Sequence, residues 1–190
     1  MKQCFLLLFL SVLLDMHMGA QNGSCAALMN ADNGASRRFL EEQNAGRVSP
    51  CIPTVITRLG QARDKDAVGV LVQYLDYLDP ASAPRPDGGA EIRPNYPAIT
   101  ALFSIGKAAT PQLLLAIRDG ESSKIRENAV KAYMFVYRDD LASGIRQLKK
   151  EELTAHSADA RRRLSDALQK LIDACNGRSD REATECKNAL

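Results

Sequence analysis

A nine-residue apolar pattern recurs four times along the chain and constrains its fold more than any other feature. In each copy the fourth residue is small or slim, and the fifth and eighth are apolar. These three positions share one helical face, so each copy predicts a helix that buries that face. The copies are IPTVITRLG from Ile52, AITALFSIG from Ala98, AVKAYMFVY from Ala129 and LSDALQKLI from Leu164, at offsets of 46, 31 and 35 residues.

A second set of apolar segments alternates with the first. It comprises AVGVLVQYL from Ala67, ATPQLLLAI from Ala109 and LASGIRQLK from Leu141, and no stretch alternates long enough to predict a strand. Helical pairs of this kind bury their shared face only against neighbouring pairs, and therefore stack into solenoids. We predict an all-α fold built from stacked helical hairpins, with an irregular helical bundle as the alternative.

The stretch GKAATPQLLLAIRDGESSKIRENAVKAYMFV resembles the HEAT-like repeats of the phycobilisome-lyase type, an armadillo-like helical family. The resemblance implies a short right-handed α-solenoid over about residues 50–175, capped at both ends. Members that attach bilins work inside photosynthetic cells, so the resemblance implies fold rather than activity. The matching positions, at the start and on the core face of the second helix, are Ile125, Arg126, Glu127, Ala129, Ala132, Tyr133 and Val136.

The first copy departs most from the family pattern because Pro53 lies inside it. Proline is tolerated in the first turn of a helix, so we expect this helix to begin near Cys51. Between the first two copies, residues 79–95 (DPASAPRPDGGAEIRPN) form a long Pro- and Gly-rich loop. Such a loop is either a binding element or a simple tether.

The N-terminus carries the apolar run CFLLLFLSVLL after Lys2. The run is too short to span a bilayer and is typical of a secretory signal peptide over residues 1–20. We expect cleavage after Ala20, with cleavage after Ala26 or an uncleaved, membrane-associated N-terminus as alternatives. The prediction is a secreted or periplasmic protein that has no membrane span after cleavage.

Three segments remain after cleavage: a lead or cap over 21–49 with a short helix at SRRFLEEQ, the repeat domain over 50–175, and a C-terminal cap over 176–190. Cleavage removes one basic and one acidic residue, so the net charge stays at +2. Dedicated nucleic-acid binders carry a strong basic excess, and no nucleic-acid partner is therefore expected.

Four cysteines remain in the mature chain, at positions 25, 51, 175 and 186. An even count in an exported protein indicates disulfides, and four cysteines allow three pairings. We favour Cys25–Cys51 with Cys175–Cys186, because each bridge would staple one terminal segment. The absence of a CxxC motif argues against a metal site, and we expect no cofactor.

No catalytic constellation stands out. His156 lies in the turn-like stretch THSAD, where Ser157 or Asp159 is suited to cap the following helix. The basic run at 161–163 is most simply a solvated face. We therefore predict a non-enzymatic protein, with a small-ligand-binding or lyase-like enzyme, using a pocket near His156 and loop 79–95, as the alternative.

The repeat register predicts a partner-binding surface for an unidentified protein or peptide. In the HEAT-like family the second helices line the concave side, which implies that their polar register positions face a partner. Phe135 occupies one of these positions, where it either meets a partner or packs beneath a neighbouring helix. The predicted surface comprises Thr54, Arg58, Tyr96, Thr100, Ser104, Glu127, Lys131, Phe135, Arg162, Asp166 and Lys170.

Overall fold

The computed structural model describes residues 25–81, 95–178, 184–186 and 188–189. These residues form helices, turns and loops, and no strand occurs among them, so the all-α prediction is confirmed. The signal peptide over 1–20 and most of the predicted loop, residues 82–94, lie outside the described residues. The chain divides into two compact units, Met1–Val55 and Ile56–Leu190.

In the first unit, residues 25–30 are helical and are followed by α2 (Asn33–Gln43). The carboxylate of Asp32 caps α2 by accepting a hydrogen bond from the Ala35 amide at 2.7 Å. The predicted helix at SRRFLEEQ falls within α2. Cys25 is paired with Cys51, as the sequence favoured, with 5.3 Å between their Cα atoms.

Helix α3 (Ile52–Gln61) crosses the division between the units, and it begins one residue after Cys51, as the position of Pro53 predicts. The second unit continues with short elements that carry the chain from α3 to α7. They are η1 (Lys65–Ala67), α4 (Val68–Gln73), α6 (Pro97–Ile105), η2 (Gly106–Ala109) and α7 (Thr110–Asp119). The long helices α8 (Ser123–Val136), α9 (Leu141–Thr154) and α10 (Ala158–Asn176) complete it.

Side-chain caps explain where these three long helices begin. Each cap residue is a serine or aspartate whose oxygen accepts a hydrogen bond from the amide three residues later. Ser157, one of two candidates from the sequence, is the cap of α10. The bonds are Ile125 N to Ser122 Oγ at 3.0 Å, Ser143 N to Asp140 Oδ1 at 3.2 Å and Ala160 N to Ser157 Oγ at 3.1 Å.

The stretch Pro97–Asp119 has the length and apolar composition of a membrane-spanning helix, and half of its most apolar window is buried inside the protein. In the structure Gly106 interrupts it with a φ of 77°, a left-handed conformation that glycine adopts without strain. The interruption separates α6 from the η2–α7 segment. Core helices pass the same test of length and composition, so this stretch also fits the interior of the second unit.

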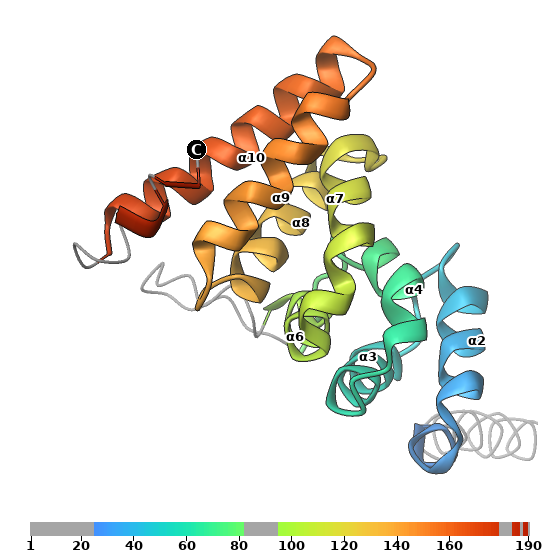
Figure 1. The fold of residues 1–190 in the computed structure, drawn as a ribbon. Coiled ribbons are helices and arrows are strands. Elements are labelled where there is room, and N and C mark those ends of the chain that lie inside the picture. The colour runs from blue at the N-terminus through green and yellow to red at the C-terminus, as the bar shows by residue number, and fades with distance from the viewer. Residues whose placement is uncertain (1–24, 82–94, 179–183, 187, 190) are drawn as a thin grey trace, which may run out of the picture. The chain divides into compact units, whose positions relative to one another are not determined.

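The second unit is built from helix pairs (Figure 1). Helix α7 packs along α8, and α9 packs along α10, while α4 contacts α6 and α7. Helix α6 also packs on α8, whereas α10 packs on α7. The repeat positions predicted to face inward are buried in all four copies, with one exception: Val136, the last residue of α8, is only half-buried.

Two close contacts explain why small residues are required. A Cβ added to Gly60 would lie 2.5 Å from the Cα of Ala101, so α3 and α6 approach here to backbone distance. A Cβ added to Gly144 on α9 would lie 3.0 Å from side-chain atoms of Leu171 on α10 and of Tyr137. The small fourth position of the repeat therefore marks a close helix contact at Ala101.

Helix α8 also carries buried polar groups that tie it to other segments. Asn128 is fully buried and donates a hydrogen bond from Nδ2 to the Leu75 carbonyl at 2.7 Å. The Tyr133 hydroxyl donates to the Gly144 carbonyl at 2.9 Å, and burial raises the Tyr133 pKa well above its usual range. Buried polar groups must be paired in this way, so both bonds specify how α8 sits in the unit.

At the C-terminus, Cys175 is paired with Cys186, the second pair favoured by the sequence, with 6.4 Å between their Cα atoms. Both cysteines are buried, as is Ala189. Arg178 donates a hydrogen bond to the Arg138 carbonyl at 2.7 Å, which ties the end of α10 to the turn between α8 and α9. The described part of the tail is therefore held against the last helices.

Candidate binding surface on helices α6, α8 and α10

All eleven residues of the predicted surface are exposed or half-buried. Because Thr54 lies in the first unit, only the remaining ten can be placed relative to one another. On the second unit, Arg58 belongs to α3; Tyr96, Thr100 and Ser104 to the start and length of α6; Glu127, Lys131 and Phe135 to α8; and Arg162, Asp166 and Lys170 to α10.

Between α6 and α8 this surface is closed by aromatic packing. The ring of Phe135 meets that of Phe103 edge to face, with 6.4 Å between centroids. The Arg138 guanidinium lies 4.9 Å from the Phe103 centroid, and Lys124 lies 5.2 Å from the Tyr96 ring. Such contacts are favourable between rings and cations at these distances. Packing against Phe103 of α6 therefore gives a structural reason for an aromatic residue at position 135.

Between α8 and α10 the surface is open. A groove of about 170 Å³ lies there, and three of the predicted residues, Glu127, Asp166 and Lys170, line it. Arg126 and Arg163 line it as well, and its apolar lining comes from Ile117, Val130 and Ala167. We refer to this feature as the α8–α10 groove.

The two arginines of the groove are held by the end of α7. Arg126 donates from Nη1 to the Gly120 carbonyl at 2.7 Å, and Arg163 donates from Nη1 to the Arg118 carbonyl at 2.8 Å. The last carbonyls of a helix have no partner inside the helix and carry partial negative charge, so they suit guanidinium donors. Both side chains are half-buried. One arginine comes from α8 and the other from α10, and both bond to the same end of α7.

Charges couple the two walls of the groove. The pKa of Glu127 lies below its usual value, chiefly because Lys131 donates a hydrogen bond to it, against a smaller opposing effect of desolvation. The charges of Lys124 and of Lys170 lower this pKa further, and Lys170 acts from α10. In total, the groove is lined by three cationic side chains and two carboxylates, which leaves an excess of one positive charge.

Sequence reasoning did not select Arg126 or Arg163 as site residues. It assigned Arg126 to the repeat match and Arg163 to a solvated basic run. The helical spacing held a usable signal, because Arg163, Asp166, Ala167 and Lys170 follow an i, i+3, i+4, i+7 pattern and must share one face of α10. The other two arginines of the run make local contacts: Arg161 donates to the Ala155 carbonyl and Arg162 to Asp159.

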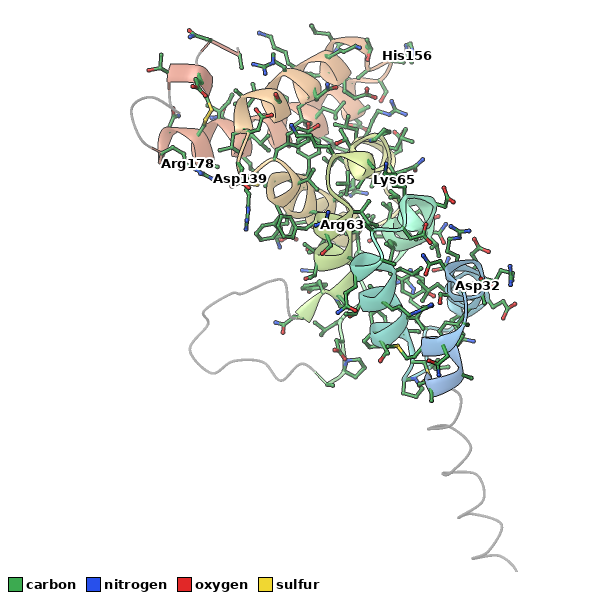
Figure 2. All side chains as sticks on the ribbon, turned by 60° about the horizontal axis from the view of Figure 1, so that its bottom comes forward. Asp32, Arg63, Lys65, Asp139, His156 and Arg178 are labelled. Atoms are coloured by element: carbon green, nitrogen blue, oxygen red, sulfur yellow. A yellow bond between two sulfur atoms is a disulfide. The ribbon has the colours of Figure 1, made fainter. Side chains whose placement is uncertain are left out.

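His156 lies apart from this surface. It is exposed in the turn between α9 and α10, at the opposite end of that hairpin from Asp139 and Arg178 (Figure 2). It lines neither the α8–α10 groove nor the smaller cavity of about 70 Å³ beside the Cys175–Cys186 bridge. Within the described residues, no cluster of three or more His, Cys, Asp or Glu side chains is arranged to hold a metal ion.

The described residues thus define an all-α protein with two cysteine pairs at bonding distance, which is typical of proteins from oxidising compartments. Comparison of the chain with protein-family models, with curated proteins and with solved structures found no match. Its function therefore has to be inferred from the groove and from the residues that line it.

Proposed function

We propose that this protein is an exported, non-catalytic binding module that holds a protein or peptide partner on its α6, α8 and α10 surface. The observation that carries the proposal is the α8–α10 groove, since a concave site lies on the surface that the repeat register selects. Its lining mixes apolar, cationic and carboxylate groups. Such a mixture suits recognition of a polypeptide better than a single-sign field would.

The proposal includes a HEAT-like α-solenoid capped at both ends. Support comes from the four register copies, each on its own helix, and from the packing of α7 along α8 and of α9 along α10. The two cysteine pairs join the terminal segments to the body of their own units, as caps would. Stacked hairpins present extended surfaces on one set of helices, which fits a binding role.

Export is the second part of the proposal. The apolar run near the N-terminus has the length of a signal peptide, and the cysteine pairs favour an oxidising compartment. A secreted or periplasmic location follows from the two together. Mass spectrometry of the mature protein tests it, with an N-terminus at Gln21 as the expected result and retention of Met1 as the contrary one.

Affinity capture from the cells that export the protein tests the binding role. The full mature chain is used as bait beside Phe135→Ala, Lys131→Glu and Lys170→Glu, with Lys150→Glu as the control of equal charge change on an exposed part of α9. We expect the two lysine variants of the surface to lower recovery of the partner at least fivefold. Equal recovery by all baits, with helical content unchanged by circular dichroism, would exclude this surface.

A further inference from the structure

We infer that the α8–α10 groove binds an acidic peptide segment, with a partner carboxylate held between the Arg126 and Arg163 guanidinium groups and a neighbouring apolar side chain in the groove. The inference rests on the proposed function and adds the chemistry of the partner. Two observations on the same groove support it. Its two arginines are anchored to carbonyl groups and not to carboxylates, and the groove has room for an apolar side chain.

Both guanidinium groups are positioned before any partner binds. Each is anchored through Nη1 to a carbonyl at the end of α7, so little side-chain freedom remains to be lost on binding. A guanidinium has five N–H donors in a planar fork, and one anchoring bond leaves the others available. The fork matches the two oxygens of a carboxylate.

Neither arginine of this pair is bonded directly to a carboxylate of the described residues. Within the described part of the chain, neither Arg126 nor Arg163 forms an ion pair with a carboxylate, because their partners are neutral carbonyl groups. Lys170 adds a third cation to the lining. The lining as a whole, with Glu127 and Asp166 included, keeps an excess of one positive charge. Two half-buried guanidinium groups without a directly bonded carboxylate favour an anionic partner there, since the low local dielectric strengthens the attraction.

The groove has room for one apolar side chain beside its charged groups. Its whole volume is about 170 Å³, it is open to solvent, and Arg126 and Arg163 belong to the same lining. Ile117, Val130 and Ala167 supply the apolar lining. A carboxylate next to a leucine or phenylalanine side chain would therefore fill both parts of the groove.

The carboxylates of the lining argue for a peptide over a nucleic acid. Glu127 and Asp166 stand among the cations, and a continuous phosphate backbone would have to pass them. The excess of one positive charge is also small beside that of dedicated nucleic-acid binders. A peptide with spaced carboxylates avoids this repulsion.

The test uses a fluorescein-labelled peptide of alternating glutamate and leucine with blocked ends, titrated with the full mature chain. The matched probes carry glutamine for glutamate, or alanine for leucine. We expect binding of the first probe by fluorescence anisotropy, at least tenfold tighter than binding of either matched probe. Equal affinities for the glutamate and glutamine probes would overturn the inference.

Variants locate the binding. The double substitution Arg126→Gln with Arg163→Gln is expected to weaken the glutamate probe at least tenfold, and Lys150→Gln less than twofold. Because both arginines also anchor α7, a second variant, Ala167→Leu, adds bulk to the lining while it replaces neither arginine, and is expected to weaken binding at least fivefold. Unchanged affinity in a folded Ala167→Leu variant would overturn the inference.

The two proposals fail differently. If the acidic probe does not bind while Lys131→Glu still lowers partner recovery, the binding role holds and the acidic peptide is wrong. If free phosphate at equal concentration displaces the probe as well as excess unlabelled peptide does, the groove is a simple anion site and the inference also falls. If partner recovery is unaffected by every surface variant, the proposed function itself is wrong.

Discussion

The two neighbouring faces that α8 shares with α6 and with α10 are equivalent in the repeat, yet one is closed and the other open. Between α6 and α8, Phe103 and Phe135 pack edge to face and Arg138 covers the ring of Phe103. Between α8 and α10 lies a groove of about 170 Å³. The same register therefore produces a packed joint at one step and a candidate site at the next.

The difference lies in what α10 packs against. Helix α10 contacts α9 and α7, whereas α6 packs directly on α8. Arg163 ties α10 to the end of α7, and Arg118 of α7 forms an ion pair with Glu151 of α9 at 2.6 Å. With α10 drawn to α7, the side chains that would close the joint with α8 line a groove instead. A binding site can thus arise from a change in packing partner, with no change in the repeat pattern.

The largest expected effect on stability comes from enlarging the small fourth residue of the repeat, which is Ala101 on α6 and Ala167 on α10. Ala101→Leu should destabilise the protein by about 3 kcal/mol, because Ala101 already meets Gly60 at backbone distance and overpacking is costly there. Ala167→Leu should cost less, about 1–2 kcal/mol, because Ala167 is buried but borders the groove, into which the longer side chain can extend. Urea denaturation measures both. Equal losses at the two sites would show that the groove is not open in solution.

A smaller effect is expected where α8 is tied to the interior. Tyr133→Phe removes the donor to the buried Gly144 carbonyl and should cost about 1–3 kcal/mol. Tyr96→Phe is the control, since its half-buried ring keeps its contact with Lys124 and should change stability by less than about 0.5 kcal/mol. Thermal unfolding of both variants measures the difference, and a neutral Tyr133→Phe would contradict the bond.

The contact between Phe103 of α6 and Phe135 of α8 should be measurable as a coupling free energy. A double-mutant cycle of Phe103→Leu and Phe135→Leu is expected to give about 0.5–1.5 kcal/mol, the usual worth of an edge-to-face pair beyond its burial. The cycle of Phe103→Leu with Ala167→Leu serves as the control and should give a coupling near zero. If the stability losses of the two single substitutions simply add, packing against Phe103 does not explain the phenylalanine at position 135.

The smallest expected effect is the pH dependence of the stability contributed by Glu127 on α8. The folded pKa of Glu127 is depressed, so its contribution is present above the unfolded value of about 4.3 and is lost as the pH falls through the folded pKa. Its side chain is 47% exposed, and solvent screening limits the contribution to about 0.3–0.5 kcal/mol.

Glu127→Gln should therefore destabilise the protein at pH 7 and have almost no effect well below pH 4. Urea denaturation at the two pH values measures this change, and Glu152→Gln on α9 is the comparison. A penalty for Glu127→Gln that is equal at both pH values would show that its charge is not the cause.

Much of the helical structure could be predicted from the sequence, because the signals are local. Apolar spacing located the helices of all four copies, and Ser157 was identified as a possible cap because a hydroxyl before a helix pairs with its free amides. Both cysteine pairs were favoured because each bridge would staple one terminal segment. Arg126 and Arg163 were missed as site residues, since their anchors are carbonyls that come from another helix.

The sequence by itself determined which face of each helix is buried, because the spacing of apolar residues is a property of one helix. Only the tertiary structure decided what each buried face meets. The apolar stripe of α10 can be covered by any helix of suitable shape, and it is covered by α9 and α7. That choice rests on contacts between distant residues, such as Arg163 with the Arg118 carbonyl and Gly144 with Leu171, and it opens the groove beside α8.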